Sequence, residues 1–332
     1  MNTASTLARL LAAIVVTGAV TASASARADT ITIATMAPKS SLWGKVFGAW
    51  SKAVNKKTNG KLVLKFYWNA TQGDETTTVA KMRSGQLDGA TLGASGLGKI
   101  HKPALALALP GLLTTWRSVD QARAAIYPEL KTAFDKKGFY LSSIGDVGRA
   151  RTLSKGRAIR TPDDIKGMKP AGPRQGLIAP VMFSVLGVTP VPTSLPELLP
   201  ALSSGRINLM VAPALAAEQL QWAPYFDHIA ADVSGIAVGA MVLSKKRLDA
   251  QPEDVLEVLR KTGKKAGQLL RARIRKEDDA AYRRLAGRMT VVTLTASEKA
   301  SWAKVAKEVR RRLSQSTFPA DLVARLEAAA AR

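Results

Sequence analysis

Short apolar runs alternate with helical patterns along the first part of the chain. Residues 30–36 and 62–68 have the pattern of strands, and residues 75–84 and 118–137 have that of helices. This alternation predicts a mostly parallel sheet covered by helices. Between the first two strands, the apolar positions of one helical face are Trp43, Val46, Phe47, Trp50 and Val54.

The same kind of pattern restarts after Thr161. Residues 176–186 and 196–203 read as helices, and residues 188–191 and 207–211 read as strands. A first lobe is therefore expected to end near residue 144, and a second α/β lobe to follow. A long charged helix is predicted over residues 252–286, and a capping box, Thr295 with Glu298, begins a last amphipathic helix.

The amino terminus has the features of a secretory signal peptide. Arg9 supplies a positive charge, residues 10–20 are apolar, and Ala26-Arg27-Ala28 is a small-x-small cleavage site. Residues 1–28 are therefore predicted to be removed, leaving a periplasmic protein that begins at Asp29. The chain has no cysteine, so it has neither disulfides nor a cysteine to carry a lipid anchor.

The chain is strongly basic, with 49 Lys and Arg residues against 25 Asp and Glu and a formal charge of +24. Removal of Arg9 and Arg27 with the signal leaves 47 basic residues against 25 acidic, or +22. The basic residues are scattered and lack the interleaved aromatic platforms of single-strand binders, which argues against nucleic acid. The positive charge would instead attract the protein to an anionic membrane surface, an acidic partner or anionic solutes.

Groups that could carry catalysis are few. The two histidines, His101 and His228, have no metal-ligand spacing around them, and no complete phosphate-loop motif is present. Asp163 and Asp164 are interpreted as residues at a helix entry rather than a catalytic pair. A non-enzymatic binding protein without a metal or cofactor is therefore favoured. The alternatives are an exported enzyme on the same fold and a basic structural or adhesive protein.

Three blocks of sequence carry a family resemblance. The runs TNGKLVLKFYWNATQGDETTTVAKMRSGQLDGA, SKGRAIRTPDDIKGMKP and GVTPVPTSLPELLPALSSGRIN resemble, in family order, the DctP-type extracytoplasmic solute-binding proteins of tripartite ATP-independent periplasmic (TRAP) transporters. The resemblance implies a two-lobed periplasmic-binding-protein-like α/β fold with crossing strands, a long inter-lobe helix and a ligand between the lobes. It also implies membrane permease subunits as partners.

The resemblance also predicts the division of the chain into lobes. Lobe I is expected to comprise residues 29–148, with part of about 238–285 returning to it. Lobe II is expected to comprise residues 149–237, with about 286–332 packing on the lobes.

Residues carried over from the family match only in part. Arg151 falls at the position of a carboxylate-binding arginine, but Ala171 stands where the main carboxylate-clamping arginine is usual, and Arg174 follows three residues later. Two further polar positions of the family correspond to Gly93 and Ala212.

These departures resemble a divergent subgroup that works with a tetratricopeptide-repeat protein and handles apolar ligands. An apolar or monocarboxylate ligand is therefore predicted. The candidate ligand-binding residues are Arg151, Arg174, Trp43, Trp68, Trp222 and Tyr225.

Overall fold

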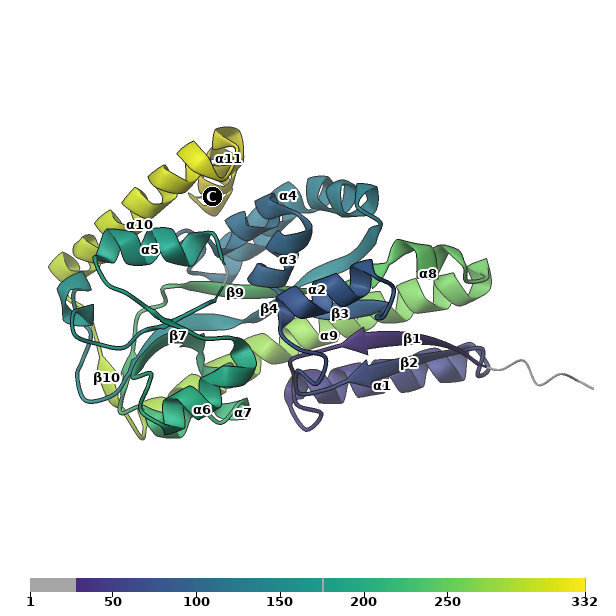
Figure 1. Cartoon of the computed structure of the whole chain (residues 1–332), viewed down its shortest axis with the longest axis horizontal. Coiled ribbons are helices and arrows are strands. Elements are labelled where there is room, and N and C mark those ends of the chain that lie inside the picture. Colours follow the sequence, from purple (N-terminus) through teal and green to yellow (C-terminus); the bar gives the residue numbers. More distant parts are fainter. Residues whose placement is uncertain (1–27, 175, 332) are drawn as a thin grey trace, which may run out of the picture.

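A computed structural model describes residues 28–174 and 176–331. Two groups of elements, which we call lobe I and lobe II, lie side by side along its long axis (Figure 1). Three elements run through both: β4 (Phe139–Ser154), β9 (Gly235–Ser244) and the helix α9 (Glu253–Ala286), whose 34 residues were predicted almost to the residue.

The remaining elements divide between the lobes in chain order. Lobe I contains β1 (Asp29–Ala34), α1 (Leu42–Lys57), β2 (Leu62–Tyr67), α2 (Glu75–Arg83), β3 (Gly89–Gly93), α3 (Ala94–Ile100), η1 (Lys102–Ala108), α4 (Trp116–Lys136), α8 (Lys245–Asp249) and α11 (Ala320–Ala331). Lobe II contains η2 (Pro162–Ile165), β5 (Ala171–Gly172), α5 (Ile178–Leu186), β6 (Val191–Pro192), η3 (Leu195–Glu197), α6 (Leu198–Ser203), β7 (Leu209–Pro213), α7 (Ala214–Gln219), η4 (Ala223–Tyr225), β8 (His228–Ala230), β10 (Thr290–Val292) and α10 (Ala296–Ser316).

The two lobes share one eight-stranded sheet instead of having a full sheet each. Its order is β10-β8-β4-β9-β3-β1-β2, with β7 also paired to β4. Pairs β1–β2 and β1–β3 are parallel as predicted, but β4 is antiparallel to β7, β8 and β9. The prediction of a mostly parallel sheet is therefore wrong at the centre. The apolar pattern alone did not indicate β9 or the full length of β4, whereas the crossing strands implied by the family resemblance are present.

Helix starts follow the local sequence. Ser41 accepts a hydrogen bond from Gly44 N at the start of α1, and Asp74 accepts one from Thr77 N at the start of α2. The capping box of Thr295 and Glu298 is present. The carboxylate of Asp164 accepts hydrogen bonds from the amides of Arg160 and Thr161, which confirms its position at a helix entry.

Apolar side chains form a core in each lobe, and side chains of α5 and α10 extend the core of lobe I. In lobe I, α1 and α9 cover one face of the sheet, where Ile31, Ile33 and Met241 are buried, while α3, α4 and α11 cover the other. In lobe II, α6, α7 and the second half of α9 bury a cluster that includes Leu153 and Ile274. The cores place the lobe boundary across β4 and β9.

A cluster of charged groups ties the lobes together at this boundary. The carboxylate of Asp146 on β4 is fully buried and forms ion pairs with Arg123 of α4 and, at 2.7 Å, with Arg275 of α9. Arg275 also binds Asp120 of α4 at 2.6 and 2.8 Å and holds the pKa of Asp120 below its usual value. These bonds fix α9 to β4 and α4 where the chain crosses between lobes.

Within residues 28–174 and 176–331, no helix is both long and apolar enough to cross a membrane. The predicted signal peptide covers residues 1–28 and lies, except for Ala28, outside the described residues. Its cleavage stays a prediction.

Candidate ligand site at the lobe boundary

The carboxyl ends of three parallel strands of lobe I meet beside lobe II. Strand β1 pairs with β2 on one side and with β3 on the other, so the crossover connections diverge at its carboxyl end. Crevices at such switch points are where α/β sheets bind ligands. At the same edge, the amide of Leu42 at the start of α1 donates a 2.8 Å hydrogen bond to the side chain of Gln219 in lobe II.

A row of three glycines crosses the sheet at this edge. Gly93 of β3 is paired with Gly239 of β9, which is paired in turn with Gly145 of β4. Directly paired residues point to the same face of a sheet, and alternation assigns this row to the face that carries Met241, two residues after Gly239 on β9. A Cβ added at Gly145 would approach only the carbonyl oxygen of Gly239, at 3.7 Å. Space is therefore open above Gly145, whereas a Cβ at Gly239 would lie 3.1 Å from the carbonyl oxygen of Leu92 and 3.4 Å from a methyl carbon of Val147.

A carboxylate lies at one end of the glycine row. Glu75, the first residue of α2, accepts hydrogen bonds from the amides of Gly93 at 2.5 Å and Gly96 at 2.7 Å. Burial raises the pKa of Glu75, and within the described residues it forms no ion pair. A Cβ at position 93 would lie 2.9 Å from the Glu75 Oε1 atom.

This carboxylate was missed by the sequence analysis, which took Gly93 to mean the loss of a polar group. The glycine is present because the carboxylate of Glu75 occupies the adjoining space. From sequence, Glu75 reads as an ordinary acidic residue in the first turn of a helix. Only the approach of α2 to the end of β3 reveals its position.

The four aromatic candidates separate into two pairs. Trp68 is partly buried and stacks on Phe66 with ring centroids 5.0 Å apart, and Trp43 is partly buried between the cores of both lobes. Trp222 is 5% exposed in the lobe II core, and Tyr225 packs against the same core. The structure thus brings Trp43 and Trp68 toward the boundary and places Trp222 inside lobe II.

Arg151 is 5% exposed and bonded within the protein. Its guanidinium donates hydrogen bonds to the carbonyl oxygens of Ala230 and Ala231 and lies 3.9 Å from the ring centroid of Tyr282 on α9. Burial lowers its pKa. Its contact with a ligand stays a prediction, and Ala212, its partner on β7, is buried beside it.

Arg174 follows β5 and is half-exposed. Its Nε and Nη2 atoms bind the two carboxylate oxygens of Glu197 at 2.9 and 2.7 Å. This pair, with bonds from Ser194, holds the pKa of Glu197 well below its usual range. Asp74 of lobe I, the residue before Glu75, also raises the pKa of Arg174. Arg174 is therefore the candidate cation of lobe II that interacts electrostatically with the acidic start of α2.

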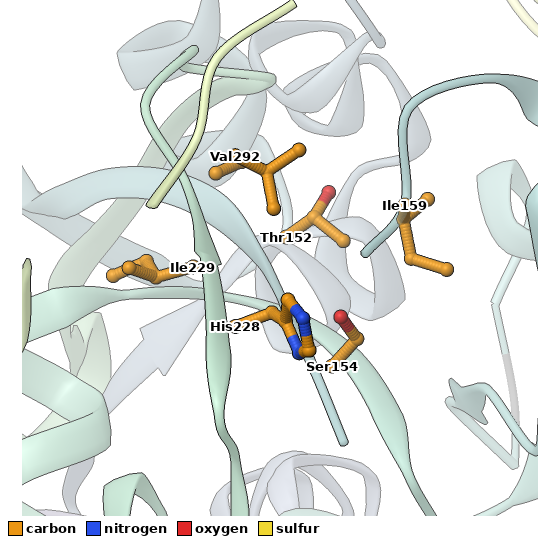
Figure 2. Close-up of a pocket in the computed structure, with 7 residues that line it drawn as sticks. Thr152, Ser154, Ile159, His228, Ile229 and Val292 are labelled. Atoms are coloured by element: carbon orange, nitrogen blue, oxygen red, sulfur yellow. The ribbon is translucent and has the colours of Figure 1, made fainter. Parts of the chain in front are cut away.

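The recess drawn in Figure 2 lies elsewhere, in lobe II. It is lined by Thr152, Ser154, Ile159, His228, Ile229, Ala230 and Val292 and encloses about 140 Å³ of empty space, too narrow for a water molecule. An open depression of about 470 Å³ lies on lobe I beside α4. Across the described residues, no group of three or more His, Asp or Glu could hold a metal ion.

Comparison with known proteins identifies the family. A model of the bacterial extracellular solute-binding proteins, family 7 (DctP), matches residues 33–316. The chain belongs to this family. Its members are extracytoplasmic binding proteins of TRAP transporters rather than enzymes, which agrees with the resemblance found in the sequence.

Curated relatives carry the same description. A solute-binding protein of Chromohalobacter salexigens is 28% identical over 170 residues, which is 50% of this chain and 49% of that protein. A solute-binding protein of Verminephrobacter eiseniae is 24% identical over 242 residues, covering 71% of this chain and 70% of that protein. The chain thus matches about half the length of the first of these relatives.

Solved structures of TRAP solute-binding proteins have the same fold. One from Ralstonia eutropha, with bound (S)-2-acetolactate, superposes with a TM-score of 0.84 at 21% identity, covering 91% of this chain and 98% of its own. A sugar acid binding protein from Advenella mimigardefordensis, in complex with galactonate, gives 0.85 at 18% identity, covering 92% and 98%. The predicted two-lobed α/β architecture of the family is confirmed.

Proposed function

We propose that this DctP-family protein is the solute-binding component of a TRAP-type transporter and binds a small organic acid with an apolar body and one carboxylate. The carrying observation is the row of Gly93, Gly239 and Gly145 at the lobe boundary, which has no side chains of its own and has open space above Gly145. A protein from Ralstonia eutropha with bound acetolactate and one from Sulfurospirillum deleyianum with bound succinate support an organic acid as ligand.

The glycine row favours an apolar body. A surface of backbone and hydrogen atoms lets a flat or branched group approach closely, and pockets for small molecules are mainly apolar with few polar anchors. Trp43 and Trp68 are the partly buried aromatic residues beside this edge. A hydrated sugar or second carboxylate would lose water here and find few donors.

The two acidic residues at the start of α2 disfavour a second negative charge. Glu75 lies at the lobe I end of the row and Asp74 precedes it as the cap of α2, and like charges in a partly buried site repel. A dicarboxylate would place a carboxylate near them. One carboxylate, directed toward lobe II, avoids this cost.

Arg174 is the better candidate for the carboxylate-binding residue than Arg151. Arg151 is buried and would have to leave two carbonyl oxygens and the ring of Tyr282. Arg174 is half-exposed in an ion pair with Glu197, and an exposed pair stabilises little because water screens its charges. Exchange of the Glu197 carboxylate for that of a ligand therefore costs little.

Calorimetric titration tests the proposal with a panel from succinate and galactonate to branched and aromatic monocarboxylates. We expect a branched or aromatic monocarboxylate to bind the wild type most tightly and Arg174→Ala to weaken it by about 1.5–3 kcal/mol. Arg311→Ala is the matched control, because Arg311 forms a similar exposed fork with Glu308 on α10. Tightest binding of a dicarboxylate or sugar acid, or equal effects of both variants, would contradict the proposed specificity.

The proposed partners are the membrane permease subunits of the transporter and, for a ligand of this kind, a tetratricopeptide-repeat protein. Mass spectrometry of the small molecules that co-purify with the protein tests the binding role itself. Recovery of no organic acid, together with no binding across the panel, would remove the support for solute capture.

A further inference from the structure

The lobe I sheet is covered on one face by two helices whose outer sides are basic. Helix α1 has four lysines and no acidic residue, and residues 258–276 of α9 contain eight Lys and Arg residues and no acidic one. This concentration of charge is not used by the proposed solute site.

The two helices lie side by side and antiparallel. Trp50 Nε1 donates a 3.0 Å hydrogen bond to Thr262 Oγ1, and Lys61, just after α1, pairs at 3.1 Å with Asp254 near the start of α9 (Figure 1). Because both helices cover the same face of the sheet, their outer sides point the same way. They form one continuous surface about 24 Å long, the length of a 16-residue helix.

Five exposed lysines mark this surface. Three of them, Lys45, Lys52 and Lys56, recur on the side of α1 opposite its buried residues, and Lys264 and Lys265 lie on the exposed side of α9. No ion pair is formed by any of these five with another described residue. We call the set Lys45, Lys52, Lys56, Lys264 and Lys265 the α1–α9 face.

The kind of cation indicates the kind of partner. Several arginines of this protein form two-pronged bonds with carboxylates, as in Arg174–Glu197, Arg284–Glu218 and Arg311–Glu308. The α1–α9 face presents lysines, which act as mobile point charges without fixed geometry. Such charges suit a diffuse anionic surface better than the oriented carboxylates of a protein. Leu269, 44% exposed and one turn after Lys265, adds an apolar group.

We infer that the α1–α9 face docks this protein on anionic phospholipid headgroups. Each Lys near an anionic membrane surface adds about fivefold to the binding constant, and the effect falls off within a Debye length. Five lysines on one flat face are therefore enough for reversible, salt-sensitive attachment, in addition to the net charge of the whole protein.

The test compares two variants with the same loss of charge. One carries Gln at all five lysines of the α1–α9 face. The control carries Gln at five exposed lysines elsewhere, on η1, α4 and α10: Lys102, Lys131, Lys136, Lys304 and Lys307. Binding is measured by co-sedimentation with vesicles of phosphatidylglycerol and phosphatidylcholine, with pure phosphatidylcholine vesicles and soluble polyglutamate as further arms.

We expect the wild type to bind the anionic vesicles at low salt and not the neutral ones. The face variant should bind at least 30-fold more weakly than the wild type, and the control variant less than threefold more weakly. If both variants bind vesicles equally weakly, net charge and not the α1–α9 face causes the binding, which contradicts the inference. Absence of vesicle binding by the wild type would also overturn it. Tighter binding to polyglutamate, lost in the face variant, would favour an acidic protein. Unchanged solute titrations in both variants separate this outcome from failure of the proposed function.

Discussion

Two adjacent residues of β4 have opposite surroundings. Gly145 belongs to the bare glycine row, with open space above it, whereas the side chain of Asp146 is fully buried between Arg123 and Arg275. Because successive residues of a strand point to opposite faces, the crossing strand has no side chain on one face at Gly145 and a buried, paired carboxylate on the other face at Asp146. Polar groups thus hold the lobes together on one side and are removed on the side where a solute is proposed to lie.

The charged side should tolerate change least. Asp146→Ala leaves Arg123 and Arg275 without their shared carboxylate in a buried setting, and removal of one partner of a buried ion pair typically costs 3–5 kcal/mol. We expect a loss of about that size in the free energy of unfolding, measured by urea denaturation. Asp163→Ala, which removes an exposed pair with Lys166, is the control and should change stability by less than about 0.5 kcal/mol. Similar losses of stability in the two variants would contradict the claim that the buried carboxylate of Asp146 holds the lobes together.

A substitution on the glycine side should have the opposite effect: ligand affinity should fall while the stability of the fold is kept. Gly145→Val places a branched side chain in open space and suits a strand better than glycine, so stability should hold or rise by about 0.5–1 kcal/mol. Ligand affinity should fall by about 1–3 kcal/mol because the site is overfilled. Gly48→Ala, where an added Cβ meets nothing within 4 Å, is the control on α1 and should leave affinity unchanged. If Gly145→Val binds the ligand with full affinity, the ligand does not lie against the glycine row.

A smaller effect is expected from the hydrogen bond between the lobes. Gln219→Ala removes the acceptor of the Leu42 amide and should lower ligand affinity by about 0.5–1.5 kcal/mol, because closure of the lobes then makes one hydrogen bond fewer. Calorimetric titration with the tightest-binding compound of the panel measures this change in affinity. Gln315→Ala on α10 is the matched control, and an unchanged affinity for Gln219→Ala would show that this bond does not contribute to closure.

The smallest expected effect is a change in pH dependence at Glu75. Burial raises its pKa above the ordinary 4.5, so the folded state holds the proton more tightly than the unfolded state. Its contribution to stability is complete below pH 4.5 and is lost as pH rises through the raised value. Glu75→Gln should therefore gain stability relative to wild type over that rise, in urea denaturation from pH 4 to 8. Parallel curves for the two proteins would contradict the burial of this carboxylate.

Local elements could be predicted from the sequence because their signals are local. Helix starts are indicated by the N-cap residues Ser41, Asp74 and Thr295. The apolar stripe of α9 is long enough to distinguish a helix from a strand. The crossing strand β9 was missed because its small residues, Gly235, Ala237 and Gly239, lack the bulky alternation of a half-buried strand. At Gly239 an added Cβ would lie 3.1 Å from the carbonyl oxygen of Leu92, a close approach of the backbone that apolar periodicity does not report.

The site was predictable only in outline. Three departures from the family pattern pointed to a site poor in polar groups, but the alignment of Gly93, Gly239 and Gly145 depends on strand pairing over nearly 150 residues. Glu75 entered the site through the packing of α2 against β3, and Arg151 turned out to be bonded to carbonyl oxygens in the interior. The fold class could thus be read from sequence, and the chemistry of the boundary could not.

The last two helices limit how far the molecule can open. Helix α10 rests on α5 of lobe II, and α11 rests on α4 of lobe I, with only Thr317, Phe318 and Pro319 between them. Three residues extend by at most about 10–11 Å. Helix α10 also holds lobe I directly, because Leu313 is buried in the lobe I core and Arg310 donates a 2.7 Å hydrogen bond to the carbonyl oxygen of Pro110. While these contacts stay in place, α10 and its short link to α11 act as a mechanical stop on the side away from α1 and limit how far the lobes swing apart.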